Sequence, residues 1–258
     1  MSLNSRVALV TGGGRGIGRA ISLGLAADGA DVAIIYRRDE AAARDTAEQI
    51  KALGRRVQLY SGSVDDFARM GEVVGEIARD LGPVSILINN AGIASRGRTV
   101  HDTEPAEMEG VVRVHTFGPF YLSKLVLPGM RAAGRGDIVM ISSVATRAYN
   151  ANGSPYNMAK AATEALVFTM SKEENRHGIR VNVVAAPLTD TEMGTRLAKA
   201  AYGVKQNIHE LDANSAFGRV AMPEDTAAMV RWLVSDANTY VSGQRIYVDG
   251  AQWQPARV

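Results

Sequence analysis

The sequence has no cysteine, and its positive and negative charges almost balance. Without cysteine the chain cannot form disulfide bonds, thiolate nucleophiles or cysteine–metal sites. The four histidines, at 101, 115, 177 and 209, show no metal-ligand spacing, so we expect no metal. A formal net charge of +2, with no run of lysine or arginine, gives no electrostatic basis for binding nucleic acid.

Long apolar runs are missing as well. None approaches the roughly 20 residues that span a bilayer. The N-terminus leads almost directly into a strand-like segment instead of the apolar region of a signal peptide. We therefore expect a cytoplasmic protein with no membrane partner. A chain of 258 residues can form one large α/β domain or two small ones.

Short apolar runs rich in valine and isoleucine alternate with longer helix-forming segments along the whole chain. Continuous runs of this kind are typical of strands buried on both faces of a parallel sheet. Glycines 29, 54 and 178 follow three of the helical segments in the stop position. Strands are predicted at 7–10, 32–35, 57–60, 84–88, 138–141, 181–184 and 246–248, and helices at 16–28, 40–53, 65–81, 104–132, 155–176 and 223–235.

This alternation predicts one doubly wound, Rossmann-type α/β domain over residues 1–258, with a seven-stranded parallel sheet and helices on both faces. One long segment, between Val184 and Pro223, does not fit the alternation; it contains helical patterns at 189–202 and, more weakly, at 204–211. Long insertions at the carboxyl end of a strand are usually functional. We therefore expect a substrate lid at about 189–217.

A glycine cluster follows the first predicted strand, reading Thr11-Gly12-Gly13-Gly14-Arg15-Gly16-Ile17-Gly18. Glycines allow a tight turn and let the backbone approach a pyrophosphate, which then lies at a helix N-terminus. The spacing is G-x-x-x-G-x-G, at 12, 16 and 18, and differs from G-x-G-x-x-G. Its place between a strand and a helix favours a nucleotide site.

Tyr156 and Lys160 are four residues apart in a predicted helix and therefore lie on one face of it. A free phenol has a pKa of about 10 and is no base near neutrality. A nearby ammonium lowers that pKa and gives an acid/base group suited to an alcohol or a ketone. Taken alone, however, Tyr-x-x-x-Lys is a common surface pair and more typical of a solvated helix face than of a catalytic site.

Together these motifs resemble the short-chain dehydrogenase/reductase family. The resemblance runs from Arg6 to Gly250 and rests on Thr11-Gly12-x-x-x-Gly16-x-Gly18, Asn89-Asn90-Ala91-Gly92, a serine that ends the fifth strand, and Tyr156-x-x-x-Lys160. In detail the chain is most similar to bacterial 3-oxoacyl-acyl-carrier-protein reductases. The resemblance implies an NAD(P)-dependent enzyme that interconverts a ketone and a secondary alcohol.

The family also suggests the roles of the catalytic residues. Its serine precedes the tyrosine by thirteen residues, which selects Ser143 over Ser142. Ser143 would orient the carbonyl group, and Tyr156 would protonate its oxygen as hydride arrives from C4 of the nicotinamide. Lys160 would lower the pKa of Tyr156 and hold the nicotinamide ribose.

The second predicted strand indicates which nicotinamide is preferred. An acidic residue at its end binds the ribose of NAD, whereas arginine accommodates the 2′-phosphate of NADP. Here the strand ends in Tyr36-Arg37-Arg38, and Arg15 in the glycine turn can approach the same 2′-phosphate from the other side. We therefore predict NADP(H). The predicted cofactor contacts are Gly12, Arg15, Gly16, Ile17, Gly18, Tyr36, Arg37, Arg38, Ser63, Val64, Asn90, Ala91, Gly92, Tyr156, Lys160, Pro187, Thr189 and Thr191.

Two positions depart from the family pattern. His115 replaces an asparagine that holds a water linking the lysine to solvent; a neutral imidazole can continue this relay, or its bulk can block it. Ala186-Pro187 replaces Pro-Gly beside the nicotinamide. An ungapped alignment keeps Thr191 at the position that meets the carboxamide and phosphates, whereas a gapped alignment loses it.

Three functions follow from this pattern. The first is an NADP(H)-dependent ketone reductase similar to 3-oxoacyl-acyl-carrier-protein reductases, with its substrate pocket at 93–97, 145–152 and 189–217. The second is a nicotinamide-binding protein with little turnover, acting as a sensor or structural subunit. The third is an NAD-dependent alcohol, sugar or steroid dehydrogenase. The resemblance also implies a homotetramer that pairs the helices at 104–132 and 155–176.

Overall fold

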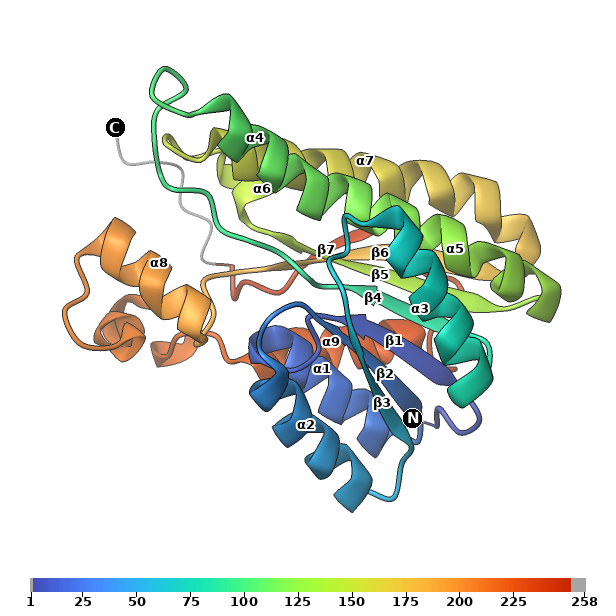
Figure 1. Ribbon diagram of the computed structural model, residues 1–258. Helices are drawn as coiled ribbons and strands as arrows, with labels where there is room; N and C mark the ends of the chain where they lie inside the picture. Colours follow the sequence, from blue (N-terminus) through green and yellow to red (C-terminus); the bar gives the residue numbers. More distant parts are fainter. Residues whose placement is uncertain (1, 252–258) are drawn as a thin grey trace.

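The computed structural model describes residues 2–251, which contain one sheet of seven parallel strands in the order β3-β2-β1-β4-β5-β6-β7 (Figure 1). The prediction of a Rossmann-type sheet is confirmed. Residues 1 and 252–258 of the predicted domain lie outside the described range. The strands are β1 Val7–Thr11, β2 Asp31–Tyr36, β3 Val57–Ser61, β4 Ile86–Asn89, β5 Gly136–Ser143, β6 Ile179–Ala186 and β7 Arg245–Tyr247.

Helices cover both faces of this sheet (Figure 1). Helices α1 Gly16–Ala27, α2 Glu40–Ala52 and α9 Pro223–Val234 lie on one face; α3 Phe67–Asp80, α5 Gly118–Ala133 and α7 Ser154–Glu174 lie on the other. Each face has its own apolar cluster, one around Ile21 and Ile34, the other around Leu9 and Val181. The continuous apolar strands predicted from the sequence supply both clusters, because alternate residues point to opposite faces.

The strand order reverses between β1 and β4. Strand β1 pairs with β2 on one side and with β4 on the other, so the chain crosses the sheet to continue in the opposite direction. In open α/β sheets such a switch point leaves a crevice at the carboxyl ends of the strands. The glycine turn after β1 and the Asn90 loop after β4 meet there.

The predicted helix at 104–132 is interrupted. The structure has α4 Pro105–Val112, then a π-helical turn at Arg113–Phe117, and then α5. A π turn inserts one extra residue into the helix, and such turns are frequent at functional sites. Apolar spacing does not reveal the extra residue, so the sequence indicated one continuous helix. The turn contains His115, which is buried.

The insertion before α9 folds as α8 Glu192–Tyr202, followed by the short 3₁₀ segments η3 Ile208–Asn214 and η4 Ala216–Gly218. The two helices predicted there are only partly correct: α8 begins after Thr191, which caps it, and the second is 3₁₀. Figure 1 shows α8 at one end of the sheet, outside the two helical layers. The insertion has a small core of its own, made of Ala198, Val204, Ile208 and Val220.

The remaining elements differ little from prediction. Helix α3 begins two residues later than expected because the Asp66 side chain caps it by accepting from the Arg69 backbone N–H. Short helices α6 Ala145–Ala148 and η2 Asn175–His177 flank α7. No helix between residues 2 and 251 has the length and apolar character needed to cross a membrane.

Candidate active site

A cavity of about 930 Å³ lies at the carboxyl ends of the strands, beside the switch point. Its lining includes every residue that the sequence predicted to contact a cofactor or to take part in catalysis. The sequence thus assigned to one site residues that come from separate strand ends, loops and helices along the chain. Lining residues that it assigned neither to the cofactor nor to the substrate include Gly14, Asp39, Ala42, Gly62 and Ser142.

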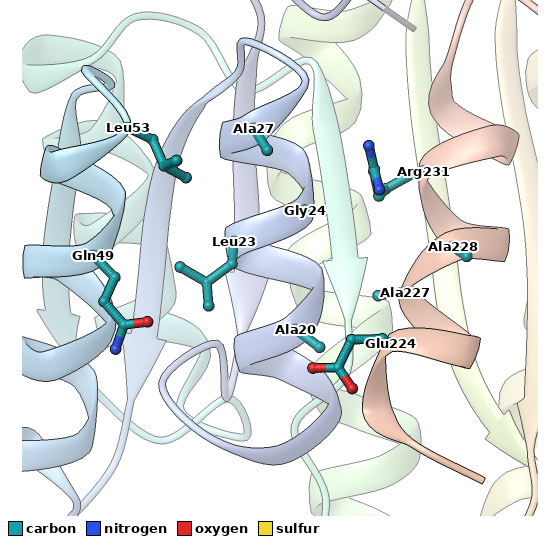
Figure 2. A pocket seen from close by; sticks show the side chains of 10 residues that line it. All are labelled: Ala20, Leu23, Gly24, Ala27, Gln49, Leu53, Glu224, Ala227, Ala228 and Arg231. Carbon is teal, nitrogen blue, oxygen red and sulfur yellow. The ribbon is translucent and has the colours of Figure 1, made fainter.

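A smaller hollow of about 390 Å³ lies among helices α1, α2 and α9 (Figure 2). Figure 2 shows Leu23 of α1 turned toward α2, with Arg231 extending from α9. Two of the hollow's polar side chains are already paired, since Arg231 binds Asp28 at 2.6 Å and Gln49 accepts from Arg19 at 2.7 Å. None of the predicted site residues lines this hollow.

The glycine turn is held open by the Asn90 loop. Thr11 Oγ1 accepts from the backbone N–H groups of Asn90 and Ala91, both at 2.9 Å, and Asn90 Nδ2 donates to the Thr11 carbonyl at 2.9 Å. A Cβ on Gly18 would lie 2.1 Å from the Gly12 carbonyl oxygen, so no larger residue fits there. The result is a backbone cradle at the start of α1, which suits a pyrophosphate.

The predicted catalytic residues come from two neighbouring elements. Ser143 ends β5, while Tyr156 and Lys160 lie one turn apart on α7. The Lys160 ammonium lies 5.6 Å from the centre of the Tyr156 ring and donates to the Ile141 carbonyl at 2.6 Å. Geometry therefore brings the three side chains to one wall of the cavity.

The electrostatics of Tyr156 differ from expectation. Burial raises the pKa of the phenol above its usual value, and the Ser143 hydroxyl only partly opposes this. The expected lowering by Lys160 is contradicted, because the ammonium points to a backbone carbonyl and desolvation dominates. At neutral pH the chain's own groups keep Tyr156 protonated, as a proton donor.

Lys160 is itself perturbed. Burial lowers the pKa of its ammonium to about 8, and the negative charge of Glu164 opposes the shift. Only 5% of the Lys160 residue is exposed, so the charge has little water to stabilise it. Lys160 is therefore the group in this wall that titrates closest to neutrality.

His115 lies on the other side of Tyr156, with the two rings edge-on and 5.2 Å between centres. Its Nε2 lies 2.8 Å from the Ile93 carbonyl oxygen and 3.0 Å from the Ile93 backbone nitrogen. Nδ1 is buried and has no hydrogen-bond partner within the described residues. Burial, helped by the charge of Lys160, lowers the pKa of His115 to about 3, so the imidazole is neutral.

These contacts fix His115 to the loop after β4. A Cβ on Gly92 would lie 2.5 Å from the imidazole, so the ring packs directly on that glycine. No hydrogen bond joins His115 to Tyr156 or Lys160 among residues 2–251. Whether the histidine relays protons or blocks the path stays a prediction.

The glycine-turn end of the cavity carries exposed charges. Arg37 and Arg38 follow β2, are exposed, and have no ion-pair partner within the described range. Arg15 is different, because it pairs with Glu192 at 2.7 Å and approaches Asp39 at 3.8 Å. The Asp39 carboxylate accepts from the Ala42 backbone N–H and thereby caps α2.

The segment after β6 also reaches the glycine turn. Pro187, Thr189 and Thr191 all line the cavity, and a Cβ on Gly16 would lie 3.2 Å from the Thr191 methyl group. Thr191 Oγ1 accepts from the Gly194 backbone N–H at 2.9 Å, which starts α8. Thr191 therefore lies beside the phosphate cradle, as the ungapped alignment requires.

Comparisons with known proteins agree with this geometry. The sequence profile of a family described as enoyl-(acyl carrier protein) reductase, within the short-chain dehydrogenases/reductases, matches residues 12–251. The chain belongs to the short-chain dehydrogenase/reductase family. It is therefore an oxidoreductase of a family that uses nicotinamide cofactors.

Individual relatives cover the whole fold. The chain is 34% identical to a 3alpha-hydroxysteroid dehydrogenase of Mediterraneibacter gnavus over 97% of this chain and 98% of the relative. It is 31% identical to an acetoacetyl-CoA reductase of Shinella zoogloeoides over 96% and 99%. The crystal structure of levodione reductase superposes with a TM-score of 0.90, at 28% identity over 96% of this chain and 98% of that one.

Sequence reasoning missed the buried Glu164 carboxylate and the ion pair that Glu192 makes. Glu164 is buried behind Lys160, and Glu192 pairs with Arg15 from a distant part of the chain. The first left a signal, since Tyr156, Lys160 and Glu164 follow each other at intervals of four on one helix face. The second left none, because 177 residues separate Arg15 from Glu192.

Proposed function

We propose that this chain is an NADP(H)-dependent oxidoreductase that interconverts an uncharged ketone and a secondary alcohol. The observation that carries the proposal is the wall made by Ser143, Tyr156 and Lys160 beside the glycine turn. When bound, the nicotinamide cofactor supplies or accepts the hydride. The glycine turn and Asn90 would hold its pyrophosphate, and Lys160 its nicotinamide ribose.

The chain's own residues then handle the carbonyl oxygen. Ser143 would donate a hydrogen bond to it and fix its direction. Tyr156, whose pKa is raised by burial, would hold the proton until the oxygen becomes basic and then release it. The Ser143 hydroxyl, which partly opposes the rise of the Tyr156 pKa, would stabilise the resulting phenolate by a hydrogen bond.

The preference for NADP(H) rests on the charges after β2. Arg37 and Arg38 are exposed and unpaired in the described structure, while the first acid, Asp39, is occupied with capping α2. A charge-assisted hydrogen bond contributes about 1.5–3 kcal/mol. One such bond to a 2′-phosphate corresponds to a preference of about ten- to a hundredfold.

The uncharged substrate follows from where the cavity's charges lie. Its charged lining residues are Arg15, Arg37, Arg38, Asp39, Glu192 and Lys160, and all except Lys160 come from the glycine-turn end or the start of α8. The other end is lined mainly by small or apolar side chains with a few polar groups: Ala94, Ser95, Ala148, Asn150, Leu188, Leu197 and Tyr202. A substrate carboxylate buried among these groups would lack a partner, which is costly.

Two relatives support this class of substrate. They are named acetoacetyl-CoA reductase and 3alpha-hydroxysteroid dehydrogenase. The resemblance to 3-oxoacyl-acyl-carrier-protein reductases makes 3-oxoacyl thioesters the first class to test. Within that class the reacting ketone stands beside an uncharged thioester, in accord with the lining.

A matched pair of substrates tests the proposal. Ethyl acetoacetate and acetoacetate share the same ketone and differ in charge, so we expect kcat/KM with NADPH to favour the ester by about a hundredfold. Equal turnover of the two would rule out the uncharged-substrate class. Tight NADPH binding without oxidation by either would favour a nicotinamide-binding protein, and equal use of NADH would favour an NAD-dependent dehydrogenase.

A variant at the lid sharpens the same test. Leu197 lies on α8, lines the cavity and is 41% exposed, so a charged side chain is tolerated there. Leu197→Arg should raise turnover of acetoacetate relative to the ester, because the guanidinium pairs with the carboxylate. Leu197→Gln is the matched control and should leave the ratio unchanged.

We further propose a cytoplasmic homotetramer. Phe117 and Phe120 are exposed beside Tyr121 on the surface formed by the π turn and α5, and Met158 of α7 is exposed as well. Exposed aromatic surface of this kind is typical of interfaces. Light scattering at micromolar concentration tests the assembly: Phe120→Glu should yield smaller species, and a monomeric wild type would contradict the proposal.

A further inference from the structure

Glu164 is a buried carboxylate that the reaction outlined above leaves without a role. It lies on α7 one turn beyond Lys160, and 3% of the residue is exposed. A buried carboxylate is costly unless several donors stabilise it. The groups that surround Glu164 therefore indicate its role.

Three elements supply those donors. Ser142 of β5 donates to Glu164 Oε1 at 2.5 Å, and Thr146 of α6 lies 2.8 Å from the same oxygen. Arg245 of β7 donates to Oε2 at 2.6 Å. Both serines that end β5 line the cavity, and Ser142 is the one whose hydroxyl binds Glu164.

The same contacts reach the catalytic wall. Thr146 Oγ1 also lies 2.9 Å from the Ser143 carbonyl oxygen, and the Ser143 hydroxyl accepts from the Ala145 backbone N–H at 3.2 Å. Glu164 therefore braces the strand end and the α6 turn that together carry Ser143. Along α7, Tyr156, Lys160 and Glu164 form one ladder at intervals of four residues.

We propose that Glu164 is a positioning residue for the ketone–alcohol reaction, which braces the Ser143 strand end and supplies the negative charge that keeps Lys160 protonated. The inference rests on the proposed function for its catalytic meaning. The proposed effect of the Glu164 charge on Lys160 depends only on residues of this chain. Glu164 is not among the residues that line the cavity, and it acts through Lys160, Ser142 and Thr146.

The charges around the pair define the expected direction. Glu164 lies one helical turn from Lys160 on α7 and pairs with the guanidinium of Arg245 from β7, while Ser142 of β5 and Thr146 of α6 contribute hydroxyls. The charged residue of α6, Arg147, lies 3.7 Å from the Asp249 carboxylate. His115, which faces Lys160 from the π turn, is neutral. Removing the carboxylate therefore leaves Lys160 with burial alone, and its pKa should fall below about 8.

Carbon-13 NMR of lysine side chains in the cofactor-free protein tests this directly. Lys160, assigned with Lys160→Arg, should titrate near pH 8 in the wild type and about one unit lower in Glu164→Gln. Glu173→Gln removes an exposed carboxylate from the same helix and is the matched control; it should leave the titration unchanged. An unchanged titration in Glu164→Gln overturns the inference, whatever the activity on ketones.

Steady-state kinetics then distinguish the effect of the Glu164 charge on Lys160 from its positioning of Ser143. Glu164→Gln should move the alkaline limb of kcat/KM for ethyl acetoacetate to lower pH by the same amount. Ser142→Ala keeps the charge and should lower kcat several-fold with the limb in place. A wild type inactive on all ketones would refute the proposed function while leaving the NMR result to decide the electrostatic role.

A second variant distinguishes a folding defect from an effect on the titration of Lys160. If Glu164→Gln leaves Arg245 unpaired and unfolds the protein, Glu164→Gln with Arg245→Gln removes both charges. The Arg245 side chain is 35% exposed and therefore screened, so Lys160 should still titrate below the wild-type value. A titration at or above the wild-type pH in the double variant would contradict the inference.

Discussion

At the glycine-turn end of the cavity the charged side chains are exposed, whereas at the Tyr156 end they are buried. Arg15 and Glu192 have more than half of their side chains in solvent, while Lys160 and Glu164 are almost fully enclosed. Exposed charges are screened and contribute little individually, but buried ones change pKa values by whole units. The exposed end is therefore suited to selecting a cofactor, and the buried end to moving a proton.

The largest effect is expected at the buried end. Tyr156→Phe removes only the hydroxyl that carries the proton, so kcat for ketone reduction should fall by about a thousandfold or more. NADPH affinity, measured by fluorescence, should change little because the ring remains. Full activity in this variant would contradict the claim that the buried end of the cavity moves the proton.

At the exposed end a single arginine should change selectivity and leave the chemistry intact. Arg37→Ala should lower the ratio of NADPH to NADH efficiency by about ten- to a hundredfold, with kcat at saturating NADPH unchanged. An unaltered ratio would show that Arg37 does not bind the 2′-phosphate. Arg44→Ala, on the exposed surface of α2, is the control.

The pH dependence of ketone reduction should follow Lys160. Its pKa lies near 8, lowered from 10.5 by burial, so the ammonium is present below that pH and is lost as the pH rises through it. Reduction should therefore decline about tenfold per unit well above pH 8. His115, with a pKa of about 3, should add no limb between about pH 5 and 8, and His115→Asn should leave that range unchanged.

The smallest effect concerns the ion pair that joins the glycine turn to α8. Glu192→Gln frees Arg15 for the cofactor, and because an exposed pair contributes at most about 1 kcal/mol, NADPH affinity should rise up to about fivefold. Isothermal titration at low and high salt would measure it. Weaker binding would mean that Glu192 holds the insertion closed over the cofactor.

Local motifs predicted the fold and the composition of the cavity well. The turn at Gly12 to Gly18 and the pair Tyr156–Lys160 depend on residues close in sequence, so their spacing indicates their geometry. The π turn at 113–117 escaped detection because one inserted residue hardly changes apolar periodicity.

Electrostatic detail was less accessible, for a physical reason. The raised pKa of Tyr156 depends on burial and on where the Lys160 ammonium points, which only the assembled structure defines. The Glu164 contacts likewise bring together β5, α6, α7 and β7. Spacing alone placed Lys160 correctly and misjudged its effect on the phenol.

The most direct test of the account measures NADPH binding and NADPH oxidation on the same wild-type sample with ethyl acetoacetate. Binding followed by fluorescence and oxidation followed by absorbance separate the exposed end of the cavity from the buried one. The account predicts tight binding together with steady oxidation of NADPH. Tight binding with no oxidation, on this ester and on cyclic ketones, would contradict it.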